Sequence, residues 1–144
     1  MFRICCLTMI SLLPLSSFAA DSADDLKALA GTWTPMKAEL AGAEMPEDFR
    51  KSVTLKITGS SYDATVGQLA EHGSFTIDVA AKPKEMKITV ADGPNKGKVY
   101  HCIYEFTGDT LRVCYDLSGE KAPTDFATAA GTKLYLVTYA RKKE

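Results

Sequence analysis

Cys102 and Cys114 are residues that could carry out chemistry, because a thiolate can act as a nucleophile, bind a metal or form a disulfide. The pairing of the two strands that contain them decides among these roles. If Phe106 faces Leu111 across the intervening turn, Cys102 faces Tyr115 and the two sulfurs lie on opposite faces. A disulfide would then need a bulge or a one-residue slip, and a slip would turn the aromatic face outward. We therefore expect two thiols with no catalytic or metal-binding role.

Histidine, serine and glycine residues form no recognisable catalytic or metal-binding motif in this sequence. His72 falls in a predicted turn and His101 at an outward strand position, and no C-x-x-C or H-x-x-x-H spacing accompanies them. No serine lies in a G-x-S-x-G turn. The glycines of "DGPNKG" lack the spacing of a phosphate-binding loop. We expect neither an enzyme nor a metal ion or other cofactor.

Aromatic residues are the remaining group of interest. Six of them fall at inward positions of the predicted strands: Tyr62, Phe75, Tyr100, Tyr104, Phe106 and Tyr115. Such a wall could line a ligand pocket, with the tyrosine hydroxyls as the few polar groups that orient a ligand. Aromatic residues in strands are also common packing units of a solid core. The sequence is compatible with both arrangements.

The elements that must position these residues are strands, because the apolar pattern has period two and turn residues recur about every ten positions. We predict eight strands: 32–40, 52–58, 61–66, 74–79, 86–91, 98–106, 111–117 and 133–140. Short connections favour antiparallel pairing of sequential strands, and closure removes exposed edges. The predicted fold is therefore all-β, an eight-stranded antiparallel up-and-down barrel. A barrel of this size either fills with side chains or holds one small ligand.

Two helical segments accompany the strands. Residues 22–31 read as a short N-terminal helix, with Ser22 as its cap and Gly31 as its end. A single helical turn is expected around Pro46 to Phe49, since proline is tolerated at a first helical position. A long loop, residues 118–132, precedes the last strand.

The first residues have the layout of a secretory signal peptide. Arg3 is followed by the apolar run Ile4 to Leu15 and then by small residues up to Ala19, after which we expect cleavage. The apolar run is shorter than the ~20 residues of a membrane-spanning helix, and Pro14 interrupts it. We therefore expect a signal peptide over 1–19, one domain over 20–144, no stable membrane anchor after cleavage, and a periplasmic or extracellular location.

Charge is nearly balanced in this chain. Removal of Arg3 with the leader leaves 16 basic residues, one fewer than the 17 of the whole sequence, against 18 acidic ones. A near-neutral chain without a basic block argues against nucleic acid as a partner. We expect a monomer.

Five motifs in order resemble a lipocalin-like domain family that is expanded in planctomycetes and, more distantly, the lipocalins. They are "LAGTW" (29–33), "DGPNKGK" (92–98), "IYEFTGDTLRVCY" (103–115), "PTDF" (123–126) and the closing stretch 134–141. In lipocalins the glycine-x-tryptophan signature closes the barrel floor under a basic residue of the last strand. The resemblance therefore implies that Gly31, Trp33 and Arg141 close one end of the barrel, with Arg141 stacked on the indole ring.

Two functions are compatible with these observations. One is a carrier that binds a small apolar or amphipathic molecule inside the barrel. The alternative is an interaction module with a filled barrel, which recognises a protein or cell-surface partner through residues 41–51 and 118–132.

Overall fold

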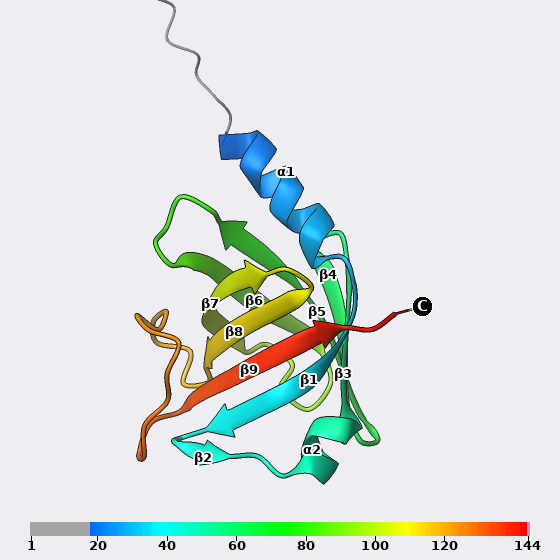
Figure 1. The fold of residues 1–144 in the computed structure, drawn as a ribbon, viewed down its shortest axis with the longest axis vertical. Coiled ribbons are helices and arrows are strands. Elements are labelled where there is room, and N and C mark those ends of the chain that lie inside the picture. The colour runs from blue at the N-terminus through cyan, green and yellow to red at the C-terminus, as the bar shows by residue number, and fades with distance from the viewer. Residues whose placement is uncertain (1–17, 144) are drawn as a thin grey trace, which may run out of the picture.

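The alternating apolar residues form strands that close into an antiparallel barrel, as the sequence predicts. The computed structural model describes residues 18–143 (Figure 1). Eight strands form the wall, and a two-residue strand extends it. The elements are α1 (Phe18–Leu29), β1 (Gly31–Leu40), β2 (Ala43–Glu44), α2 (Glu47–Ser52), β3 (Val53–Thr58), β4 (Ser61–Val66), β5 (Leu69–Asp78), β6 (Lys84–Asp92), β7 (Val99–Thr107), β8 (Thr110–Asp116) and β9 (Leu134–Arg141).

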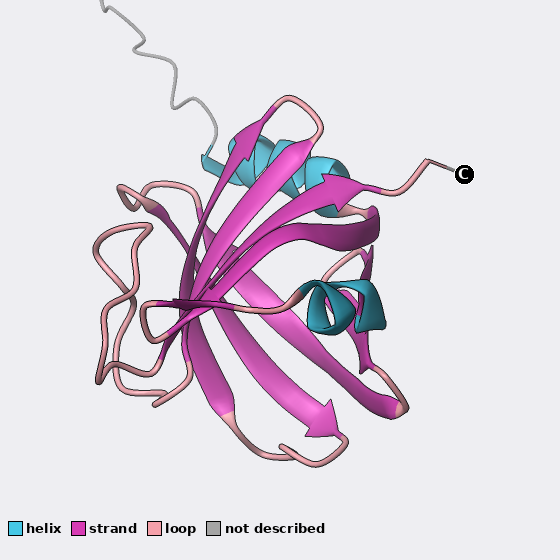
Figure 2. Cartoon of the chain, turned by 60° about the horizontal axis from the view of Figure 1, so that its bottom comes forward, coloured by secondary structure: helices cyan, strands magenta, loops and turns pink. Residues whose placement is uncertain are grey.

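Strand β1 closes the barrel by pairing with both ends of the sheet. Its residues from Trp33 to Leu40 pair with β9, while only 31–33 pair with β3. Beyond Trp33 the two strands separate, and α2 packs against β1 there. The Arg50 guanidinium donates a 2.6 Å hydrogen bond to the carbonyl oxygen of Met36 in this gap. Figure 2 shows α2 beside the wall at this position.

The β7–β8 hairpin has the predicted register. Phe106 pairs with Leu111, Cys102 with Tyr115, and Ile103 with Cys114. Cys102 and Cys114 are both free and buried. The expectation of two separate thiols is confirmed, because this register places successive side chains of each strand on alternate faces of the sheet.

The largest differences from the predicted boundaries are in β5 and α1. Strand β5 begins at Leu69 instead of Ser74, so His72 lies within a strand, paired with Asp63, and not in a turn. The predicted strands left residues 67–73 as a turn, whereas the β4–β5 turn is confined to two residues. Helix α1 begins at Phe18, so Ser22 is not its cap, and it ends at Leu29. Gly31 begins β1 instead, with φ at +132°. The alanine-rich sequence before Ser22 readily continues a helix.

The predicted signal peptide lies mostly on residues 1–17, which are outside the described part of the chain. Within residues 18–143, the helices are too short or too polar to cross a membrane.

The connection between β8 and β9 folds back over the outer face of the barrel. Asp116, only 6% exposed, anchors it by accepting hydrogen bonds from the backbone N–H groups of Ser118, Glu120 and Lys121. The outward side chains of Ile103 and Cys114 are fully buried, and the Cys114 thiol lies 3.9 Å from the carbonyl oxygen of Ala127 in this connection. The outer face of the barrel is therefore covered at Cys114 by this connection.

Candidate ligand-binding site

The interior of the barrel contains a cavity of about 500 Å³. Its walls are the inward positions of the strands, mostly aliphatic and aromatic. The deeper lining residues include Leu55, Ile57, Phe75, Met86, Ile88, Leu111, Val113 and Tyr139. The volume lies within the ~300–1,000 Å³ typical of small-molecule sites.

The cavity opens at the end of the barrel away from α1. Its mouth is lined by α2, the tip of the β4–β5 hairpin, the β6–β7 loop and the start of β9: Phe49, Val66, Leu69, Pro94, Asn95, Lys98, Leu117 and Tyr135. Val66, Leu69 and Leu117 are among the most exposed large apolar side chains of the described residues. The entrance is therefore apolar on several sides.

Four of the six aromatic residues predicted to bind ligand line this cavity: Tyr62, Phe75, Tyr100 and Tyr115. Tyr104 and Phe106 point inward but lie at the closed end. The Tyr104 hydroxyl donates a 2.7 Å hydrogen bond to Asp25 of α1, and the Phe106 ring packs edge-on against Tyr104 at 5.9 Å. The structure does not bring these two residues to the cavity.

A carboxylate stands inside the mouth. The Tyr62 hydroxyl donates to Glu71 Oε1 at 2.8 Å, and Asn95 Nδ2 donates to Glu71 Oε2 at 3.2 Å. Glu71 pairs across the ladder with Ala64, whose small side chain leaves space beside the carboxylate. Burial, and secondarily the hydrogen bond and negative charge of Glu71, raise the pKa of Tyr62, which keeps its proton for this bond.

Gly73 makes room for the Tyr62 ring. A Cβ atom at this position would lie 2.8 Å from Tyr62 Cε1 and 2.9 Å from its hydroxyl oxygen, and would also clash with the carbonyl oxygen of Thr89. The β5–β6 ladder shifts register between His72 and Gly73. Glycine therefore leaves room beside β5 for the phenol ring, whose hydroxyl reaches Glu71.

Three tyrosines form a second polar group, from β8 and β9. The hydroxyls of Tyr115 and Tyr139 lie 2.8 Å apart in a hydrogen bond, and the Tyr115 ring stacks on Tyr135 at 5.5 Å. Burial raises the pKa of Tyr115 and Tyr139, and it raises that of Tyr135 to about 12. These phenols stay neutral and can donate or accept hydrogen bonds.

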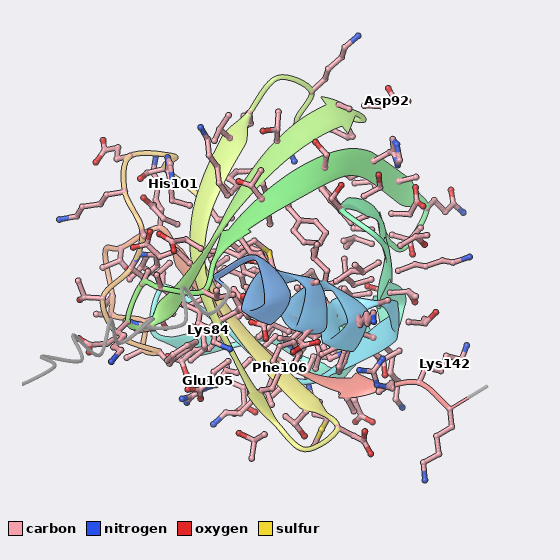
Figure 3. All side chains as sticks on the ribbon, turned by 90° about the horizontal axis from the view of Figure 1, so that it is seen from above. Lys84, Asp92, His101, Glu105, Phe106 and Lys142 are labelled. Atoms are coloured by element: carbon pink, nitrogen blue, oxygen red, sulfur yellow. The ribbon has the colours of Figure 1, made fainter. Side chains whose placement is uncertain are left out.

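The opposite end of the barrel is covered in part by Trp33 and α1. Trp33 is fully buried, and its indole Nε1 donates a 2.8 Å hydrogen bond to the carbonyl oxygen of Leu29. Lys84 pairs with Asp25 of α1 at 2.9 Å. Figure 3, viewed from above, shows α1 lying across this end with Lys84 and Phe106 beside it.

Sequence reasoning missed several lining residues. Tyr135 and Tyr139 follow the same period-two pattern as Val137 between them, so alternation along β9 would have found them. Glu71 lies four residues before Phe75 and thus on the same face, but the predicted strand began too late to include it. Asn95 reaches the cavity from a loop, and no alternation predicts it.

The histidines lie away from the cavity lining. His72 Nδ1 lies 2.8 Å from Asp63 on the exposed outer surface, and His101 projects from β7 on the outer face. In the part of the chain that the structure describes, no three His, Cys, Asp or Glu side chains are arranged to hold a metal ion.

The chain was compared with known protein families, curated proteins and solved structures. No protein-family model, curated protein or solved structure matches the chain.

Proposed function

We propose that the protein is an exported, lipocalin-like carrier that binds a small apolar or amphipathic molecule inside its barrel. The observation that carries the proposal is the cavity of about 500 Å³, whose lining reaches the end of the barrel opposite α1. Its lining combines a large apolar wall with a few polar groups, the combination typical of small-molecule sites. Export rests on the signal-like order of Arg3, the apolar run and Ala19.

The chemistry of the lining favours an elongated guest with distinct ends. Apart from the paired hydroxyls of Tyr115 and Tyr139, the deep part is apolar, and burial of a hydrocarbon surface there contributes about 25 cal/mol per Å². The polar groups Glu71, Asn95 and Lys98 lie toward the mouth. A guest with an apolar body and one polar end fits this gradient.

The alternative, a filled barrel that recognises a partner through residues 41–51 and 118–132, has less support. This alternative assumes an interior filled with side chains, whereas the barrel contains a cavity of about 500 Å³. The second of these loops also packs on the wall, since Thr128 Oγ1 hydrogen-bonds both Glu39 and the backbone N–H of Gly42.

Native mass spectrometry of protein purified from its own host tests whether a guest is retained. We expect an adduct that disappears on denaturation. Repeated absence of any adduct, together with failure to bind a neutral apolar probe, would contradict the carrier proposal.

A blocked cavity gives a sharper test. Ala64 points inward near the mouth and Thr65, its neighbour in β4, is exposed. We expect Ala64→Trp to lower the affinity for the neutral fluorophore N-phenyl-1-naphthylamine by about tenfold or more, since a bulky ring displaces the guest. Thr65→Trp is the matched control and should bind as the parent protein does. Equal probe binding by both variants would place the probe elsewhere.

A further inference from the structure

The mouth of the cavity is chemically asymmetric. Among the described lining residues, Glu71 and Lys98 carry formal charges. Glu71 is partly buried and held by two protein donors, whereas Lys98 is exposed. An exposed ammonium on a flexible stem is hydrated and screened, so its attraction for a ligand anion is weak. The carboxylate is therefore the preorganised charge of the entrance.

The two donors leave Glu71 with unused capacity. A carboxylate offers about four lone-pair positions, and the bonds from Tyr62 and Asn95 take one on each oxygen. The remaining positions can accept donors from a guest. Ala64 opposite Glu71 provides the space for such a group to approach.

The layers of inward side chains place this carboxylate near the entrance. From the hairpin tip downward, the pairs that share the ladder are Val66 with Leu69, Ala64 with Glu71, and Tyr62 with Gly73. Glu71 is thus one layer below the exposed rim. A head group bound there leaves the deeper, mostly apolar part of the cavity to the rest of the molecule.

We propose that the guest is an amphiphile whose head group carries a protonated amine, paired with Glu71, while its apolar body fills the barrel. This inference rests on the proposed function and names its ligand class. A protonated amine supplies both charge and several donors, and charge-assisted hydrogen bonds are roughly twice as strong as neutral ones. A carboxylate head would instead bring a second negative charge beside Glu71, and like charges at close range repel.

The test compares three guests with the same alkyl chain: decylamine, decanol and decanoate. Each displaces N-phenyl-1-naphthylamine from the full chain at neutral pH, where the amine and the acid are ionised. We expect decylamine to bind about tenfold or more tightly than decanoate, with decanol between them. Glu71→Gln keeps the size and one acceptor but removes the charge. It should lower decylamine affinity by about tenfold and leave decanol affinity within about twofold.

Glu85→Gln is the matched control, because Glu85 is an exposed residue of β6 outside the cavity lining. It should leave all three affinities unchanged. If decanoate binds as tightly as decylamine, or if Glu71→Gln leaves the amine preference intact, the head-group inference is overturned and the carrier proposal stands. If neither the probe nor any of the three guests binds, the carrier proposal itself fails.

Discussion

The guanidinium of Arg141 lies 4.3 Å from the centre of the Trp33 ring, at the point where the first and last strands pair. Its two terminal nitrogens each donate a 2.6 Å hydrogen bond, one to the carbonyl oxygen of Ala30 and one to that of Ala28. One side chain thus joins the end of β9, the start of β1 and the last turn of α1. A cation at the C-terminal end of a helix also complements the helix dipole.

Replacement of Trp33 should destabilise the whole barrel. The side chain is fully buried in the core, and Trp33→Ala should lower the free energy of unfolding by about 3–5 kcal/mol, as for other buried large aromatics. Urea unfolding followed by circular dichroism measures this change. Trp33→Phe keeps most of the apolar volume and should cost less. An unchanged midpoint for Trp33→Ala would contradict the sealing role.

Arg141→Lys should separate charge from geometry. Lysine keeps the positive charge but cannot donate to both helix carbonyls from one planar group, so we expect a loss of about 1–3 kcal/mol. Thermal unfolding compares this variant with Lys142→Ala, whose exposed side chain should be replaceable without loss. Equal melting temperatures for the two variants would show that the two hydrogen bonds of the guanidinium contribute nothing to stability.

Gly73→Ala should disturb the site and the fold together. The new Cβ would displace the Tyr62 ring and the Thr89 carbonyl, and overpacking of this kind costs about 1–3 kcal/mol. We also expect weaker binding of N-phenyl-1-naphthylamine, because the displaced ring enters the cavity. Gly67→Ala is the comparison, since its φ of +62° imposes backbone strain but its Cβ would meet no atom within 4 Å. It should lose stability and retain probe binding.

Asp116→Asn should loosen the connection between β8 and β9. Burial raises the pKa of the Asp116 carboxyl, but the hydrogen bonds from Lys121, Ser118 and Glu120 outweigh it, and the net shift is below the usual 3.8. A lowered pKa means that the ionised form stabilises the fold above pH 3.8, and that this contribution is lost as the pH falls through the lower folded-state value.

The parent protein should therefore be more stable than Asp116→Asn at neutral pH, by about 1–3 kcal/mol, and the difference should shrink in acid. Urea unfolding across pH measures it. Trypsin should also cleave the variant faster after Lys121. A difference that stays constant down to the lowest pH would exclude the ionised carboxylate as its cause.

Cys102 and Cys114 should be unreactive in the folded protein. Burial is the largest cause that raises the pKa of both thiols above the ordinary 9.0, so the reactive thiolate is disfavoured. Because the folded-state pKa is raised, the protonated thiols contribute their full share to the free energy of unfolding below pH 9.0. This contribution is lost as the pH rises above 9.0 through the folded-state pKa. Labelling with a thiol-specific disulfide reagent, located by peptide mass spectrometry, should modify both residues only in denaturant. In Asp116→Asn, Cys114 should react before Cys102, because the cover over it is loosened.

Strand alternation predicted most of this architecture because each strand has one apolar face. The pairing of Phe106 with Leu111 followed from the need to keep both aromatic faces inward, and it placed the two cysteines correctly. Alternation indicates which way a side chain points but not its height along the barrel. Tyr100 and Tyr104, four residues apart on the same face of β7, therefore belong to different ends: Tyr100 lines the cavity, and Tyr104 bonds Asp25 of α1.

The polar part of the site was harder to predict. Glu71 is a charged residue at an inward position, between glycines that read as a turn, and its partners come from β4 and from a loop. Likewise, Ile103 and Cys114 face outward by alternation yet are fully buried, and the β8–β9 connection contacts Cys114 through Ala127. Contacts of this kind depend on tertiary placement and leave no periodic signal.

The pairing of β1 on both sides affects how the described chain can meet another molecule. Each of the eight wall strands has a neighbour on both sides. Where β1 separates from β3, the Arg50 guanidinium donates to the carbonyl oxygen of Met36, and the backbone N–H of Met45 donates to that of Ala38. Unpaired strand edges are the templates on which sheets of separate molecules join. Because the wall offers little of such an edge, we expect contacts of the described chain with other molecules to use side chains and loops more than an added strand.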